Sequence, residues 1–161
     1  MCIRDSLKNP SHFLATLGGI GNIPFAPGTF GSIFSWLIFI FLSHFVNMFY
    51  VTFIGIFLSI WICEMASKNL IHKDHRSIVI DELIGIWIAL LPVLYLADTQ
   101  KERTVYAIAA LLFFRIFDIF KPFPVSYFDE NFKNGTGIVI DDLIAGVMAI
   151  IPSYIILTLL V

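Results

Sequence analysis

The sequence predicts an all-α fold, a polytopic membrane bundle of about four to five helical spans with an internal repeat. Hydrophobic residues make up 58% of the 161-residue chain and charged residues only 14%, whereas a soluble domain is about 25% charged. The stretch between Asn9 and Cys63 contains no Asp, Glu, Lys or Arg. A block with two adjacent acids occurs at residues 77–84 and again at 137–144. These features together favour a membrane protein over a soluble domain.

Five apolar segments are candidates for the membrane spans, because a helix needs roughly 20 apolar residues to cross the hydrocarbon core. In chain order, the candidates are residues 29–46, 49–65, 83–97, 105–120 and 143–161. The third and fourth segments are short once their charged ends are removed, which is why the prediction is about four to five spans.

The N-terminal residues 1–6 are set apart from the rest of the chain. Their back-translation resembles the transposase end sequence used in making sequencing libraries, so we expect them to be a sequencing or assembly artefact. We expect residues 7–161 to form a single domain. Cys63 is then the only natural cysteine, and no disulfide framework is predicted.

The charges of the connecting segments predict how the bundle is oriented. Residues 66–77 and 115–137 each carry three Lys or Arg residues, whereas residues 43–50 carry only His44. Positive charge favours the cytoplasmic side, so both acidic blocks and the N-terminus are predicted to face the cytoplasm. The net charge of −2 and the lack of a basic patch argue against a nucleic-acid partner.

The acidic repeat is the clearest functional signal. Asp81-Glu82 and Asp141-Asp142 occupy equivalent positions sixty residues apart. Neighbouring helical residues point about 100° apart, so the two acids of one pair cannot easily bind the same ion. Asp81 and Asp141 are therefore predicted to converge from two helices as metal ligands. Glu82 and Asp142 would supply a second ligand position or orient the first, and oxygen ligands favour Mg²⁺. The structural alternative is that acids near a helix start complement the helix dipole.

A glycine-rich segment at residues 18–32 precedes the first apolar stretch. It ends with Gly28, Thr29, Gly31 and Ser32, where a membrane helix is predicted to begin. Free N–H groups at a helix start suit a phosphate. The alternative is a turn into a helix that Thr29 or Ser32 caps, since no lysine follows the glycines as it does in a P-loop.

A third group of charged residues lies in the segment 114–124. Arg115, Asp118 and Lys121 are spaced by three residues and share a helix face, and Pro122 ends the helix. The group is either an interfacial salt bridge with a snorkelling lysine or one more metal carboxylate with two cations for phosphate oxygens.

Three more acids have weaker signals. Glu64, near the end of the second apolar segment, either faces the same cluster or pairs with Lys68. Asp129 and Glu130 are predicted to form a solvated face.

Taken together, these segments resemble the phosphatidylglycerophosphatase A family over nearly the whole chain from Leu14 onward. The motifs that carry the resemblance are PGTFGS at 27–32, SIVIDELIG at 77–85, FRIFDIFKPFP at 114–124 and GTGIVIDDLIAG at 135–146. One departure is Asn134, where a second glycine beside Gly135 is expected. The resemblance implies a bacterial inner-membrane hydrolase that faces the cytoplasm, needs Mg²⁺ and removes the terminal phosphate of phosphatidylglycerophosphate to give phosphatidylglycerol.

The candidate site follows from these motifs and from the resemblance. The predicted catalytic residues are Asp81, Glu82, Asp118, Lys121, Asp141 and Asp142. The predicted metal ligands are Asp81, Asp118 and Asp141, and the predicted phosphate-binding residues are Gly28, Thr29, Gly31, Ser32 and Arg115. The nucleophile is either water or a side chain. The alternative function is a small membrane transporter with a carboxylate-lined site, although such a site should lie near the bilayer midplane between broken helices.

Overall fold

A computed structural model describes residues 10–67, 77–132 and 134–161 of the chain. The expected artefact at residues 1–6 lies outside this part. So do four of the loop cations that predicted the orientation: Lys68, Lys73, Arg76 and Lys133.

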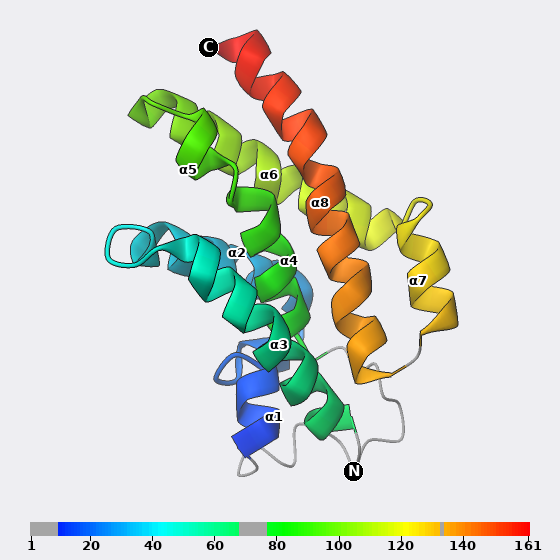
Figure 1. Ribbon diagram of the computed structural model, residues 1–161. Coiled ribbons are helices and arrows are strands. Elements are labelled where there is room, and N and C mark those ends of the chain that lie inside the picture. Colours follow the sequence, from blue (N-terminus) through cyan, green and yellow to red (C-terminus); the bar gives the residue numbers. More distant parts are fainter. Residues whose placement is uncertain (1–9, 68–76, 133) are drawn as a thin grey trace.

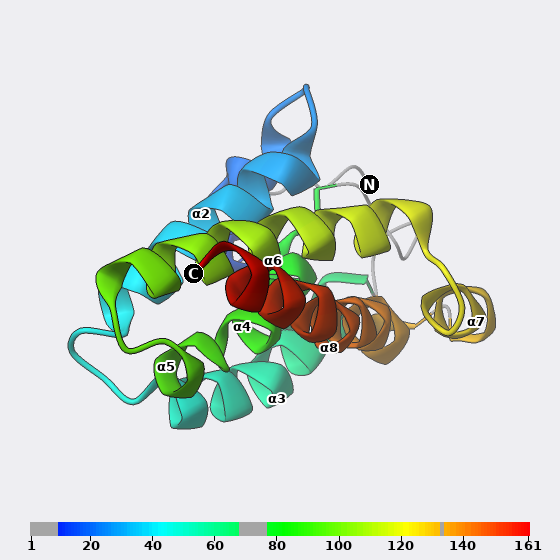
Figure 2. The same cartoon turned by 90° about the horizontal axis from the view of Figure 1, so that it is seen from above.

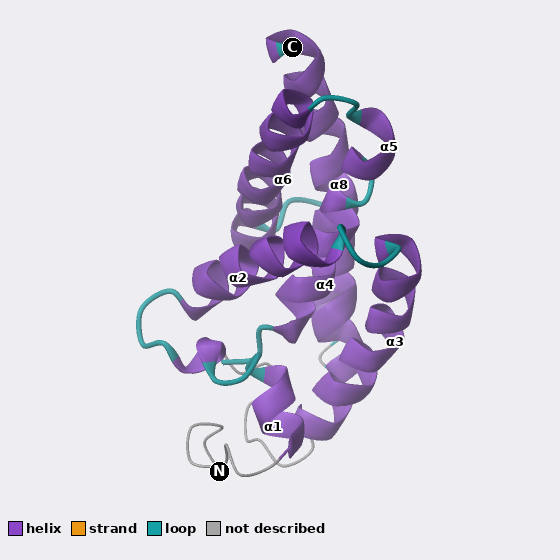
Figure 3. Ribbon diagram, turned by 90° about the vertical axis from the view of Figure 1, so that its left-hand side faces the viewer, coloured by secondary structure: helices purple, strands orange, loops and turns teal. Residues whose placement is uncertain are grey.

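The described residues are mainly helical and contain no strand (Figures 1 and 3). The elements are α1 (Pro10–Ala15), the 3₁₀ turn η2 (Ile20–Asn22), α2 (Pro27–Leu42), α3 (Met48–Ser67), α4 (Ile80–Leu90), α5 (Val93–Leu96), α6 (Gln100–Phe120), α7 (Val125–Asn131) and α8 (Gly135–Leu160). The all-α part of the prediction is confirmed.

The predicted spans correspond to helices of unequal length. Two helices are long and apolar enough to cross a membrane, over Met48–Ala66 in α3 and Gly135–Leu160 in α8. The third candidate is split into α4 and α5 around Pro92, which lacks the N–H that a continuous helix needs. The bundle of about four to five spans therefore stays a prediction.

The outer faces of the two long helices are apolar. Only 28% of the apolar window of each is buried. Exposed side chains include Phe57 and Trp61 on α3 and Ile151 and Leu159 on α8. A large exposed apolar surface is unusual for a soluble monomer and typical of a protein that contacts lipid or a partner. These faces fit membrane association.

Helix α4 lies at the centre of the bundle, in contact with α2, α3, α6 and α8 (Figures 1 and 2). At the crossing of α4 and α8, a Cβ atom on Gly146 would collide with the carbonyl oxygen of Gly85. A Cβ atom on Gly85 would in turn collide with the Phe114 ring of α6. Small residues let helix backbones approach closely. These glycines therefore hold α4, α6 and α8 close together near the acidic residues.

The two copies of the repeat differ in local structure. In the first copy, Ile78 and Val79 are not helical, the Val79 N–H donates to the carbonyl of Ala15 at 3.0 Å, and α4 begins at Ile80. The second copy is helical throughout, because α8 already begins at Gly135. We expected both acid pairs at helix starts, and this was wrong for the second copy.

The early start of α8 has two visible causes. The side chain of Asn134 accepts a hydrogen bond from the Gly137 N–H at 2.8 Å, and Glu64 Oε2 of α3 accepts one from the Gly135 N–H at 3.1 Å. Both acceptors satisfy N–H groups that a helix start leaves unpaired. Asn134, the departure from the family pattern, thus acts as a helix cap.

Candidate active site

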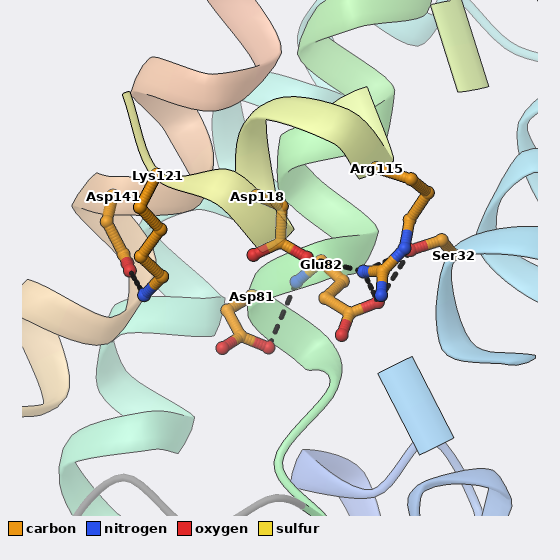
Figure 4. Close-up of polar contacts among 7 residues, drawn as sticks. All are labelled: Ser32, Asp81, Glu82, Arg115, Asp118, Lys121 and Asp141. Carbon is orange, nitrogen blue, oxygen red and sulfur yellow. Dashed lines mark hydrogen bonds and ion pairs between the residues drawn. The ribbon is translucent and has the colours of Figure 1, made fainter. Parts of the chain in front are cut away.

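The predicted site residues gather where α2, α4, α6, α7 and α8 approach one another (Figure 4). The residues drawn there are Ser32 of α2, Asp81 and Glu82 of α4, Arg115 and Asp118 of α6, Lys121 at the end of α6 and Asp141 of α8. Figure 4 shows Asp81, Asp118 and Asp141, which come from three different helices, in the same cluster.

Arg115 is the centre of one half of the site. Its Nη1 lies 3.1 Å from Glu82 Oε2, and it donates to Asp118 Oδ2 and to Ser32 Oγ. The Ser32 hydroxyl donates to Glu82 Oε2 at 2.6 Å. One guanidinium nitrogen therefore links α2, α4 and α6.

Lys121 is the centre of the other half. Its Nζ donates to Asp141 Oδ2 at 2.7 Å and to Asp129 Oδ1 at 2.6 Å. Asp129 and Glu130 were expected to form a solvated face; Glu130 is exposed, while Asp129 is partly exposed and also pairs with Lys121. Eight residues separate Lys121 from Asp129, a spacing that no helix periodicity brings together. The turn at Pro122 folds α7 back toward the end of α6, and the sequence alone did not show this.

The cluster holds more carboxylates than cations. Asp81 and Asp142 are buried, and within the described residues neither has an ion pair. Among the described residues, Asp81 Oδ1 accepts a hydrogen bond only from the neighbouring N–H of Glu82. Asp141 Oδ1 is buried and has no hydrogen-bond partner in the same part of the chain. Buried carboxylates without partners are costly, so this arrangement favours a ligand that carries positive charge.

The pKa values of the two acids at the start of α4 reflect the same excess of carboxylates over cations. Burial raises the pKa of Glu82 to about 7, against the opposing effects of Arg115 and Ser32. Burial, together with the charge of Glu82, raises the pKa of Asp81 well above its usual range. A cation placed among these groups would lower both pKa values.

The donor set fits a hard cation in its chemistry, since all the candidate ligands are carboxylate oxygens. As they lie, the described residues contain no group of three His, Cys, Asp or Glu arranged to hold a metal ion. Asp118 and Asp141 are instead occupied by Arg115 and Lys121. To bind a cation, Asp118 and Asp141 would have to coordinate it while keeping, or giving up, their ion pairs with Arg115 and Lys121.

The start of α2 faces the Arg115 half of the site. A Cβ atom on Gly28 would fall on Glu82 Oε1 and lie 3.2 Å from Arg115 Nη2, so a larger residue here would displace the Glu82 side chain. Gly31 instead packs against Val79, and Thr29 is half-buried in the first turn. The helix begins at Pro27 after Ala26, which caps it without a side-chain hydrogen bond.

The expectation that Thr29 or Ser32 caps α2 was wrong. The helix starts before both residues, and Ser32 bonds to Glu82 instead. The N–H groups of Gly28 and Thr29 belong to the first turn, where a helix has no internal acceptors for them.

Comparison with known proteins identifies the family. A profile described as PgpA: Phosphatidylglycerophosphatase A matches residues 13–157. The chain belongs to the phosphatidylglycerophosphatase A family. This confirms the resemblance inferred from the motifs, and family membership makes the chain a phosphatase, that is, a phosphoric monoester hydrolase.

Three curated relatives show how far the similarity extends. The Phosphatidylglycerophosphatase A of Escherichia coli is 38% identical over 91% of this chain and 83% of its own length. That of Haemophilus influenzae is 38% identical over 92% of this chain and 90% of its own length. A Putative phosphatidylinositol-3-phosphatase of Bacteroides thetaiotaomicron is 36% identical over 90% of this chain and 94% of its own length. No solved structure matches the chain.

Proposed function

We propose that this protein removes the terminal phosphate of phosphatidylglycerophosphate in a Mg²⁺-dependent hydrolysis that yields phosphatidylglycerol. The observation that carries the proposal is a cluster of five carboxylates, four of them buried, with two partly buried cations, built from the motifs that carry the family resemblance. Such a cluster suits phosphoryl transfer, in which positioning and electrostatic stabilisation supply most of the catalysis.

The phosphate would enter on the Arg115 side. Arg115 already spans Glu82, Asp118 and Ser32, and a guanidinium fork matches phosphate oxygens. The first-turn N–H groups of Gly28 and Thr29 would add partial positive charge, which is favourable for an anion. The absence of a side chain on Gly28 lets Glu82 and Arg115 approach the backbone at the start of α2.

The metal would be held by Asp81, Asp118 and Asp141, with Glu82 and Asp142 beside them. Bound Mg²⁺ would supply charge neutralisation of the phosphate oxygens. Its charge would also offset the excess of buried carboxylates, which gives the unpartnered Asp141 Oδ1 a function.

The remaining chemistry would fall to the chain's own groups. A water oxygen attacks phosphorus, the bond from phosphorus to the glycerol oxygen breaks, and a proton reaches that leaving oxygen. Lys121 and Arg115 would stabilise the negative charge as it shifts toward the leaving oxygen. Glu82, a buried carboxylate next to the proposed metal ligand Asp81, would take the proton from the attacking water.

The membrane would hold the lipid tails while the head group reacts. The apolar faces of α3 and α8 support membrane association. The matched relatives from Escherichia coli and Haemophilus influenzae are bacterial. We place the protein in the bacterial inner membrane, with the site on the cytoplasmic face as the loop charges predict.

A substrate panel with the purified protein in detergent tests this proposal. Phosphate release should be fastest from phosphatidylglycerophosphate, slower from phosphatidylinositol 3-phosphate and negligible from glycerol 3-phosphate, which has no acyl chains. A preference for phosphatidylinositol 3-phosphate would move the substrate assignment to the activity named for the Bacteroides relative. No phosphate release from any lipid would defeat the reaction and favour the transporter alternative.

A further inference from the structure

One lysine of the site is shared by two carboxylates on different helices. Lys121 Nζ lies 2.7 Å from Asp141 Oδ2 and 2.6 Å from Asp129 Oδ1. The Asp141 side chain is 7% exposed and the Asp129 side chain is 38% exposed. The ammonium group therefore sits between an inner carboxylate of the cluster and an outer carboxylate at its edge.

The backbone fixes the base of Lys121 while its side chain stays flexible. Lys121 ends α6 in the left-handed conformation, with φ 42° and ψ 57°, and its N–H donates to the carbonyl of Phe117 at 2.9 Å. Asp129 is carried by α7, which packs against α8 and buries Val125. Both carboxylates thus belong to neighbouring helices, and the four-carbon stem of lysine can move between them.

Asp141 cannot serve two cations equally well. The ammonium of Lys121 and a divalent ion would compete for the same carboxylate and repel each other. Without a second partner, Lys121 would either block Asp141 or leave the site for solvent. Asp129 gives it a second position within the site.

We propose that Asp129 is a positioning residue that holds Lys121 beside the substrate when Asp141 binds the cation. This inference rests on the proposed function, because it requires a divalent ion at Asp141. It predicts that Asp129 affects cation binding only through Lys121.

A double-mutant cycle measured by Mn²⁺ binding tests this prediction without substrate. The bound fraction is followed by electron paramagnetic resonance in detergent for the wild type, Asp129→Asn, Lys121→Gln and the double variant. Asp129→Asn should weaken Mn²⁺ binding about three-fold or more, the range typical of coupled neighbours. In the Lys121→Gln background, the same change should have no effect.

Two further variants control for charge and folding. Asp129→Glu keeps the negative charge and should bind Mn²⁺ as the wild type does. Glu130→Gln removes the same charge from the neighbouring exposed position on α7 and should also leave binding unchanged. Each variant is first checked for a single peak in size-exclusion chromatography, and Asp129→Ser, which also removes the carboxylate, carries the test if Asp129→Asn does not fold.

The outcomes separate this inference from the proposed reaction. Equal weakening by Asp129→Asn in both backgrounds would show that Asp129 acts directly on the cation and would overturn the positioning role. A wild-type protein that binds no Mn²⁺ would overturn it as well. The expected cycle in a protein that releases no phosphate from phosphatidylglycerophosphate would support the positioning role and defeat the reaction.

Discussion

The two copies of the acidic repeat share a sequence pattern but differ in which acid is paired. In the first copy the second acid, Glu82, contacts Arg115. In the second copy the first acid, Asp141, contacts Lys121. The other two acids, Asp81 and Asp142, are buried and have no ion pair within the described residues.

The difference follows from where each helix begins. The first copy enters α4 only at Ile80, while the second lies within α8, which starts six residues before Asp141. Glu82 of α4 contacts α2 through Ser32 and α6 through Arg115, whereas α8 packs against α7 as well as α6. Equivalent positions in sequence therefore have different neighbours, and a duplicated motif here builds one asymmetric site.

The largest effects should come from the predicted metal ligands of both copies. Asp81→Asn and Asp141→Asn should each lower turnover by about 100-fold or more, because the loss of a ligand removes several kcal/mol of charge neutralisation. Phosphate release at saturating Mg²⁺ and thermal unfolding in detergent measure the two effects. Folding should be retained, since Asp81 has no cation partner within the described residues and Lys121 keeps its contact with Asp129 when Asp141 is changed. Near-normal turnover in both variants would show that Asp81 and Asp141 are not metal ligands.

Substitution of the second acid should change stability in opposite directions in the two copies of the repeat. Glu82→Gln should lower the melting temperature, because it breaks the contact with Arg115, and a hydrogen bond to a charged group contributes about 1.5–3 kcal/mol. Asp142→Asn should raise it, because it neutralises a buried carboxylate that has no cation partner. Melting temperatures of the two variants, measured under the same detergent conditions, decide the matter. Shifts of the same sign would show that the two copies are equivalent.

The two cations should differ in how they tolerate substitution. Arg115→Lys should reduce turnover by about 10- to 100-fold, because an ammonium lacks the planar fork with which a guanidinium can bind two phosphate oxygens at once. Lys121→Arg keeps a charge that can still bridge two carboxylates, so it should retain more activity than Arg115→Lys. Parallel measurements of kcat and KM make the comparison. If Lys121→Arg proves the more damaging of the two, the guanidinium is not the main phosphate ligand.

The smallest effect should come from the α2 contact. Ser32→Ala removes the hydrogen bond to Glu82 and should cost about 1 kcal/mol of stability with a several-fold rise in KM. Ser35→Ala is the matched control, since the Ser35 hydroxyl bonds within α2 to the carbonyl of Gly31. Equal changes in KM for both variants would indicate a general effect on α2 instead of a contact with the site.

Much of the fold and the residues of the cluster could be predicted from the sequence, while their pairing could not. The apolar segments and the spacing of Arg115 and Asp118 follow helical periodicity, so the helices and this ion pair could be expected. The start of α8 depends on Glu64 from another helix, and the Lys121–Asp129 contact depends on how α7 folds back. These are tertiary contacts between segments far apart in sequence or joined by a turn, and no local pattern records them.

We propose that the two unequal copies of the acidic repeat form one magnesium-dependent phosphatase site. The most direct measurement is phosphate release from phosphatidylglycerophosphate by chelator-treated protein as Mg²⁺ is added back. Phosphate release should be almost absent in the chelator, and its rate should rise to a plateau as Mg²⁺ is added. Full turnover in the presence of chelator would contradict it.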